Sequence, residues 1–401
     1  MKFSISILLR LVTFLLVGVL PCHADELPTD SIEISLLTCS PHQEVYSLYG
    51  HTAIRVEDKS TGNDFVVNYG MFSFDQPYFV LRFVFGLTDY DMGITNFERF
   101  RDEYSYYGSS VTQQTLDLTP DEKRHILTAL EENSRPENVT YRYNYFFDNC
   151  TTRARDMLVD HLDGKVTYNS SLDSTMTFRS MIHMCNEDYP WARFGNDMLL
   201  GYQADARTSV SDRQFLPIHL MADFSTATIK TSDDHERPLI KTTREILPAG
   251  IQVVEDGFPL RPRTCFLILL IITLAVSLWE IWRQRVSWVF DALLMTVCGL
   301  AGIVLTAMIF SYHPTVSQNF QLLLLNPLPL LLAFPVARNT CRQRYHWWWK
   351  VCFTLIIIFF ICNFIQKYAE GMNILALSLL TRCIIHEFFK IKKSGKKDKN
   401  A

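Results

Sequence analysis

The sequence predicts an α+β domain followed by a bundle of about five transmembrane helices. Before about residue 262 the apolar residues alternate or recur at helical spacing, whereas long apolar runs follow that point. The connections between these runs alternate between basic and nearly uncharged, as in multispanning membrane proteins. The first residues have the pattern of a secretory signal peptide, so we expect the α+β domain to be exported.

The signal peptide is predicted to cover residues 1–24. A basic start precedes an apolar stretch, and the small residue Ala24 stands before Asp25. Cys22 could be the lipid-attachment site of a lipoprotein. However, the cleavage that precedes lipid attachment requires a small residue before the cysteine, and Pro21 fits this requirement poorly. Cleavage and retention as an anchor both leave the following domain outside the cytoplasm.

Composition divides the chain into four predicted segments. They are the signal peptide (1–24), an exported domain (25–262), transmembrane helices (263–389) and a basic cytoplasmic tail (390–401). An odd number of spans puts the exported domain and the tail on opposite sides of the membrane. The formal net charge of -4 shows no excess of basic residues, so nucleic acid is excluded as a partner. The apolar runs cover residues 264–281, 288–310, 321–336, 351–366 and 371–387.

The prolines and the ionisable residues of these runs give two further predictions. The prolines of the third run remove backbone hydrogen-bond donors and predict a kinked or broken helix. This break either lines an opening for a lipid or merely bends the helix; the residues are Asn326, Pro327, Pro329 and Pro335. The ionisable residues fall at the ends of the runs, which disfavours an ion-coupled transporter; they are Glu280, Asp291, His386 and Glu387.

The exported domain is predicted to begin with a short antiparallel sheet. SIEISLLT, HTAIRVED and DFVVNYGMF have strand patterns, and a turn through KSTGN joins the last two as a hairpin. A helix is expected over Thr119 to Glu132, with Thr119 as its cap, Pro120 in its first turn and Glu122 completing a capping box. Residues 190–225 are predicted to be helix and loop, and the domain ends in strand-like alternation.

Cys150 is the predicted nucleophile. The segment YRYNYFFDNCTTRARDMLVDHL changes at Asp148 from aromatic, extended residues to apolar residues at helical spacing. Asp148 or Asn149 then caps a helix, and Cys150 falls in its first turn. Backbone N–H groups and the helix dipole there stabilise a thiolate and can hold an oxyanion.

His51 is the predicted base for this thiol. It begins a strand behind Gly50, which permits close approach of another backbone or of a substrate. With the hairpin turn near residues 58–63, Asn68 lies about opposite Ala53, where it can hold the imidazole. The residues predicted to bind substrate beside this pair are Tyr49, Asn149 and Arg153.

Neighbouring residues leave three interpretations open. Arg153, Arg155 and Asp156 either bind a phosphate headgroup or pair with one another on the surface. The aromatic stretch between residues 72 and 90 forms ordinary core, an acyl-chain groove or a membrane-facing patch, with core favoured. Cys39 and Cys185 can form a disulfide, which leaves Cys150 as the odd exported thiol. The exported histidines show no metal-ligand spacing, so no metal or cofactor is expected.

The order of the two central residues resembles that of permuted papain-like enzymes, such as relatives of lecithin:retinol acyltransferase. His51 precedes Cys150 by about 100 residues, whereas ordinary papain-like chains present the cysteine first. A closer resemblance covers roughly residues 31–225. SLYGHTAIRV, VVNYGMFSFDQPYFVLRFVFGLTDYDM, TQQTLDLT, ENVTYRYNYFFDNCTTRARDML and FLPIHLM resemble the periplasmic domain of the Lnb lipoprotein N-acyltransferase family, whose members continue into membrane spans.

This resemblance implies a permuted papain-like periplasmic domain on a multi-pass protein of the bacterial inner membrane, with a cytoplasmic C-terminus. It implies transfer of an acyl chain from a membrane phospholipid, through a thioester on Cys150, to the free amine of the diacylglyceryl-cysteine of lipoproteins. His51 and Cys150 match the family's His and Cys. The alternatives are a papain-like thiol hydrolase acting on peptidoglycan peptides and a non-enzymatic membrane scaffold.

Overall fold

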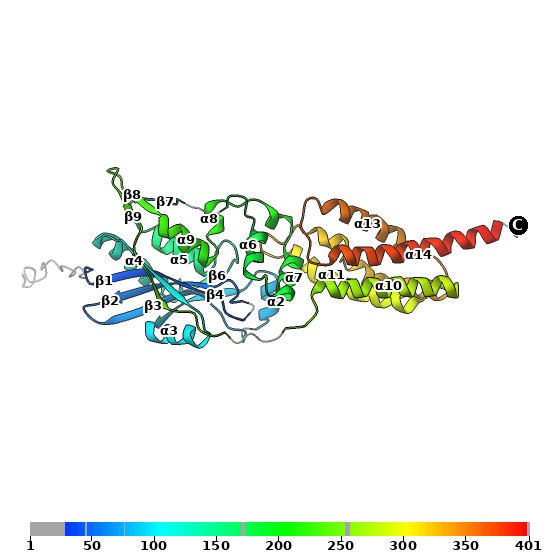
Figure 1. The fold of residues 1–401 in the computed structure, drawn as a ribbon, viewed down its shortest axis with the longest axis horizontal. Helices are drawn as coiled ribbons and strands as arrows, with labels where there is room; N and C mark the ends of the chain where they lie inside the picture. The colour runs from blue at the N-terminus through cyan, green and yellow to red at the C-terminus, as the bar shows by residue number, and fades with distance from the viewer. Residues whose placement is uncertain (1–28, 45, 76, 170–172, 253–256, 399–401) are drawn as a thin grey trace, which may run out of the picture.

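The structure is a computed structural model that describes residues 29–44, 46–75, 77–169, 173–252 and 257–398. The predicted signal peptide, with Cys22, and the end of the basic tail lie outside the described residues. An α+β domain lies at one end of an elongated molecule and a bundle of helices at the other (Figure 1). The predicted fold class, an antiparallel α+β domain followed by apolar helices, is confirmed.

The domain is built on a seven-stranded antiparallel sheet of order β10-β5-β1-β2-β3-β4-β6. The first three strands and their hairpin lie where the alternating pattern predicts them. Seven strands form this sheet: β1 (Ile32–Cys39), β2 (His51–Asp58), β3 (Asn63–Met71), β4 (Asp89–Asn96), β5 (Val111–Leu116), β6 (Thr140–Arg142) and β10 (Ile240–Leu247). A second, three-stranded sheet contains β7 (Lys165–Thr167), β8 (Thr228–Lys230) and β9 (Glu236–Pro238).

Helices cover both faces of the large sheet (Figure 1). On one face Leu36, Ile54 and Val67 pack against α5 and α9, and on the other Leu37 and Val66 pack against α3. Thr119 caps α4 in the predicted capping box. The helices of the domain are α2 (Phe79–Val84), α3 (Phe97–Tyr106), α4 (Pro120–Asn133), α5 (Cys150–Val159), α6 (Phe178–Cys185), α7 (Pro190–Leu199), α8 (Val210–Arg213) and α9 (Pro217–Thr226), with the 3₁₀ turn η1 (Tyr202–Asp205).

Four helical segments of the bundle are long and apolar enough to span a membrane, and a fifth apolar helix is shorter. The short helix is α13, whose 15 residues extend about 22 Å against a hydrocarbon core of about 30 Å. All five predicted runs therefore form helices, but these helices differ in length. The elements are α10 (Pro262–Arg283), α11 (Trp288–Ile309), η2 (Phe320–Leu323) with α12 (Leu328–Cys341), α13 (Trp348–Cys362) and α14 (Met372–Asp398).

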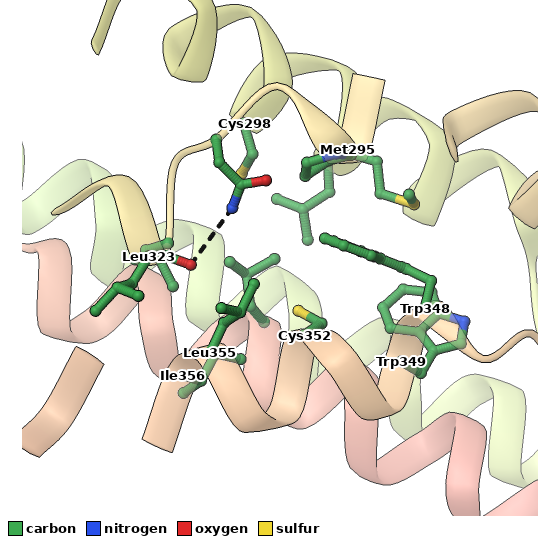
Figure 2. A pocket seen from close by; sticks show the side chains of 13 residues that line it. Met295, Cys298, Leu323, Trp348, Trp349, Cys352, Leu355 and Ile356 are labelled. Atoms are coloured by element: carbon green, nitrogen blue, oxygen red, sulfur yellow. Dashed lines mark hydrogen bonds between the residues drawn. The ribbon is translucent and has the colours of Figure 1, made fainter. Parts of the chain in front are cut away.

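The third span is broken, as its prolines predict. The chain leaves the 3₁₀ turn η2 and begins α12 after Pro327, and Gly302 of α11 packs against the backbone of Asn326 at the break. Figure 2 shows this region, where Asn326 Nδ2 donates to the Leu323 carbonyl at 3.4 Å. The adjoining cavity measures about 20 Å³, room for little more than one water. The break therefore bends the chain, and the cavity beside it is too small for a lipid chain.

A buried ionic cluster joins three helices of the bundle. Arg382 of α14 donates to Asp291 of α11 at 2.7 Å and to Glu280 of α10 at 2.6 Å. His386 contacts the other oxygen of Asp291 at 2.7 Å. The arginine and both carboxylates are fully buried, and each of these charges has a partner of opposite charge within the bundle. Such pairing is needed because an unpaired buried charge is strongly destabilising. The cluster serves to fix the helices against one another.

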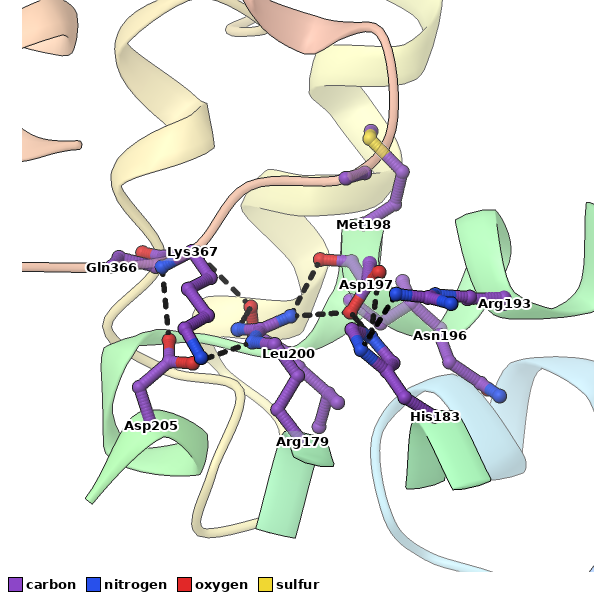
Figure 3. Close-up of polar contacts among 12 residues, drawn as sticks. Arg179, His183, Arg193, Asn196, Asp197, Met198, Leu200, Asp205, Gln366 and Lys367 are labelled. Carbon is purple, nitrogen blue, oxygen red and sulfur yellow. Dashed lines mark hydrogen bonds and ion pairs between the residues drawn. The ribbon is translucent and has the colours of Figure 1, made fainter. Parts of the chain in front are cut away.

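Arg179 fixes the domain to the bundle. Its guanidinium is buried and pairs with Asp197 at 2.7 Å and Asp205 at 2.9 Å, while it also donates to the carbonyls of Leu200 and Gly201. The same chain segment is then bound from the bundle side: Gln321 donates to the Asp197 carbonyl, Gln366 to the Leu200 carbonyl and the Lys367 backbone to Asp205. Figure 3 shows how these groups converge. One buried cation thus organises the loops on which the two parts meet.

Replacing Arg179 is expected to weaken this joint. The Arg179→Gln change leaves two buried carboxylates without their cation, at a cost of about 3 kcal/mol in unfolding free energy. Thermal unfolding of the detergent-solubilised protein measures it. The matched control is Arg135→Gln, which removes a half-exposed pair with Glu132 and costs below about 1 kcal/mol. Equal shifts in Tm for the two variants contradict the assigned role.

Candidate active site

Strand β2 and helix α5 bring His51 and Cys150 together. His51 begins the strand and Cys150 begins the helix, which packs across β2 and β3. The next residue of each element forms the contact between them, because Thr52 Oγ1 donates to Thr151 Oγ1 at 3.2 Å and both side chains are fully buried. The two predicted residues, separated widely in sequence, therefore share one site.

Asn149 fixes the first turn of α5. Its Oδ1 accepts hydrogen bonds from the backbone N–H groups of Thr151 and Thr152, each at 2.9 Å. Its Nδ2 donates to the carbonyls of Tyr145 and Phe215 at 3.0 and 2.9 Å. These contacts use the full hydrogen-bonding capacity of the amide. The cap at this position is confirmed. Asn149 also lines the cavity that holds Cys150, and its predicted contact with substrate stays a prediction.

Asn68 holds the imidazole of His51. It lies on β3 opposite Ala53, the register that the hairpin predicted, and its Oδ1 is 3.1 Å from His51 Nε2. The asparagine is buried, so this contact is shielded from water. The imidazole is also close enough to the thiol of Cys150 for each group to shift the pKa of the other. With Nε2 at Asn68, Nδ1 is the ring nitrogen left for the thiol.

The electrostatics of the pair favour a thiolate beside an imidazolium. Burial raises the pKa of the Cys150 thiol, but the charge and hydrogen bond of His51, together with the Thr52 backbone N–H, outweigh burial and leave that pKa below its ordinary value. Burial lowers the pKa of His51, yet Cys150 and Asn68 outweigh it and raise that pKa. The opposite shifts describe a pair in which each charge stabilises the other.

A large cavity connects this pair with the bundle. Its volume is about 1010 Å³, and Cys150, His51 and Asn68 line it at the domain side. Met308 and Val316, at and after the end of α11, line it at the bundle side. The wall between them is mainly aromatic and includes Phe72, Phe74, Phe79, Phe83, Tyr90 and Tyr143. The arrangement gives a thiol at the end of a space large enough for a lipid chain.

Of the other two predicted binding residues, Tyr49 lines the cavity and Arg153 does not. Tyr49 lines the cavity, and its hydroxyl accepts a hydrogen bond from Asn196 Nδ2 at 2.6 Å. Arg153 is absent from the cavity wall formed by the described residues, and instead pairs bidentately with Asp148 at 2.6 and 2.9 Å over the Tyr141 ring. The guanidinium of Arg153 is thus already engaged within the domain, and its predicted contact with substrate stays a prediction.

The exported thiols are free. Cys39 lies in β1 opposite His51, whereas Cys185 ends α6 in another cluster of the core, so the disulfide considered between them does not form. Burial raises the pKa of Cys185 to about 11 and raises that of Cys39 further. Cys150 is the exported thiol whose pKa is lowered.

Sequence reasoning missed Gly70 and Tyr143 at this site. Gly70 has a φ of +85°, and a Cβ there would lie 3.6 Å from Cys150 Cβ and 3.6 Å from the Tyr143 ring. A glycine inside a strand marks a close approach of another group, so this position carried a signal. The residue leaves space beside the thiol.

The oxyanion donors are fewer than predicted. The N–H groups of Thr151 and Thr152 bond to the Asn149 side chain, and that of Arg153 bonds to the Asn149 carbonyl. Among the described first-turn groups, the N–H of Cys150 itself is left to face an oxyanion.

Two family models match this chain. The model described as the Lnb N-terminal periplasmic domain matches residues 21–183, and the model described as the Lnb transmembrane domain matches residues 254–394. The chain belongs to the Lnb family. It is therefore a membrane protein with a periplasmic N-terminal domain. No curated protein and no solved structure matches it.

The reactivity of Cys150 is expected to follow the paired pKa values. The thiolate forms as pH rises through the lowered pKa of Cys150, and its imidazolium partner is lost as pH rises through the raised pKa of His51. Iodoacetamide labelling, quantified on the Cys150 peptide, should therefore persist at pH values where Cys185 remains unlabelled. His51→Ala is expected to move the labelling midpoint of Cys150 upward by about 1 to 2 pH units. An unmoved midpoint contradicts the pairing.

Loss of the Asn149 cap is expected to affect both stability and the thiol. Asn149→Ala removes the acceptor of two backbone N–H groups and costs about 1 to 2 kcal/mol of unfolding free energy. The matched control, Thr119→Ala, removes the cap of α4 and costs about 1 kcal/mol at a distance from the site. Only the first variant should slow iodoacetamide labelling of Cys150. Slowing by both variants indicates general loosening in place of positioning.

Proposed function

We propose that this Lnb-family protein is a lipoprotein N-acyltransferase. In this proposal an acyl chain leaves a membrane phospholipid, rests on Cys150 as a thioester and passes to the free amine of the diacylglyceryl-cysteine at a lipoprotein N-terminus. Cys150 and His51 are the catalytic residues, and no metal or cofactor takes part.

The cavity is the single observation that carries the proposal. It joins a thiol of lowered pKa to the end of a membrane span through a mainly aromatic wall. A hydrolase of peptidoglycan peptides needs a polar groove open to the periplasm, whereas this space leads from the thiol towards the bundle. The site therefore suits a substrate that arrives from the membrane.

The first half-reaction forms the thioester. The Cys150 thiolate attacks the ester carbonyl carbon of the phospholipid, and the Cys150 N–H stabilises the oxyanion that forms there. As the carbon–sulfur bond forms and the ester carbon–oxygen bond breaks, the His51 imidazolium gives its proton to the departing lysophospholipid oxygen. The products are an acyl-enzyme, a neutral imidazole and a lysophospholipid.

The second half-reaction transfers the acyl chain. The neutral amine of the diacylglyceryl-cysteine attacks the thioester carbonyl, and His51 takes the proton that the amine loses as the amide bond forms. The carbon–sulfur bond breaks and returns the Cys150 thiolate beside an imidazolium. Asn68 acts as a positioning residue, because its side chain holds the ring orientation that both proton transfers require.

The topology of the proposal follows the charges of the connections. We assign residues 25–262 to the periplasmic catalytic domain, 263–389 to the spans and 390–401 to a cytoplasmic tail. The C-terminal end of α14 lies at the far end of the bundle from the domain (Figure 1), which supports opposite sides for the two. Basic residues near that end favour the cytoplasmic face of the inner membrane.

Mass spectrometry of lipoprotein N-terminal peptides tests this function. In cells lacking the gene, wild-type protein should restore the amide-linked acyl chain, whereas Cys150→Ala should lower its formation about a thousand-fold or more. Cys185→Ala is the matched control, because it removes an exported thiol of raised pKa and should restore acylation fully. Acylation that is independent of the gene, with no other acyltransferase present, overturns the proposal and favours the hydrolase.

A further inference from the structure

Helix α2 presents an apolar face that no other part of the described chain covers. It has six residues, and none of its side chains is buried. Tyr78, Val80 and Leu81 are 82%, 73% and 62% exposed. Clusters of large exposed apolar side chains are uncommon on surfaces that face water, and they mark contacts with a partner or a membrane.

This face is continuous with the end of a membrane span. The Tyr312 backbone N–H donates to the Phe85 carbonyl at 3.0 Å, and His313 Nε2 donates to the Phe83 carbonyl at 3.1 Å. Both donors follow α11 directly, and Phe310 before them is 71% exposed. Figure 1 shows α2 on the side of the domain nearest the bundle. The exposed apolar residues of α2 and those at the end of α11 thus lie on chain segments that are hydrogen-bonded to each other.

The single charge of the segment is directed back to the protein. Arg82 pairs with Asp89 at 2.8 Å and donates to the Leu87 carbonyl at 3.1 Å. The helix therefore places no unmatched charge among its apolar residues. A tyrosine beside aliphatic residues, at the end of a span, is the composition that favours the membrane interface.

The inner side of the same segment faces the cavity. Phe79 and Phe83 line it, and the Phe79 ring lies 5.6 Å from that of Phe72 on the cavity wall. Helix α2 thus separates exposed apolar side chains on one side from the cavity that reaches Cys150 on the other.

We propose that α2 lies in the interface of the periplasmic leaflet, with Tyr78, Val80 and Leu81 against phospholipid acyl chains, and forms the rim over which a chain passes into the cavity. The contact with lipid stands by itself, whereas passage of a reacting chain rests on the proposed function. The occupant of this face is the phospholipid of the leaflet.

Photo-cross-linking of the full-length protein tests the contact. The cross-linker p-benzoylphenylalanine replaces Leu81 in a Cys150→Ala background, reconstituted in vesicles of phosphatidylethanolamine and phosphatidylglycerol. The matched control has the cross-linker at His235, which is 85% exposed at its side chain and lies in the β8–β9 turn at the opposite end of the domain (Figure 1). After irradiation, peptide mass spectrometry should find about ten-fold more phospholipid adduct at position 81 than at position 235, because only an immersed residue touches acyl chains.

Equal adduct yields at the two positions, or no lipid adduct at position 81, overturn the proposal. A protein adduct at position 81 does so as well, since it assigns the face to another chain. Because the cross-linked protein lacks its nucleophile, the result is independent of catalysis. Failure of the acyltransferase proposal in the lipoprotein assay is therefore distinguishable from failure of this lipid contact.

Discussion

The site depends on how the first turn of α5 packs against the start of β2. Burial alone raises the pKa of a thiol, and it is the nearby imidazole of His51 that reverses the shift at Cys150. That proximity is set by groups that do no chemistry: the Thr52–Thr151 hydrogen bond between the elements and the Asn149 cap that ties the turn to two other segments. A thiol of lowered pKa thus depends on the precise position of its neighbours more than on unusual residue types.

A second constraint joins the site to the membrane. The carbonyls and carboxylates between Asp197, near the end of α7, and Asp205 are bound by Arg179 from within the domain and by glutamines from the bundle. A buried arginine is costly unless its donors are matched, and here two carboxylates and three carbonyls match them. The cavity has walls from both parts, so its shape is defined only when this joint is formed. The position of the thiol relative to the bundle is therefore set by the whole fold.

Local rules explain which features could be predicted from the sequence. Alternation fixed the strands and hairpin register, so Asn68 opposite Ala53 followed from counting, and capping chemistry located the start of α5. The engagement of Asn149 by Phe215 and the placement of Arg179 depend on partners distant in the chain, which no local pattern reveals. Whether Cys39 and Cys185 form a disulfide, and which carboxylate Arg153 pairs with, could not be decided from the sequence, because composition cannot say which groups already have partners.

The aromatic stretch between residues 72 and 90 shows how one segment can serve several environments. Phe72 and Tyr90 pack against the core as favoured from composition and also line the cavity with Phe83, whereas Tyr78 and Leu81 face outward. On the proposed function this arrangement has a chemical consequence. A thioester is open to attack by water as well as by an amine, and the phenylalanines of the cavity wall offer no hydrogen bond that would hold a water near Cys150. The same residues that admit a lipid chain then favour its transfer to an amine over its loss by hydrolysis.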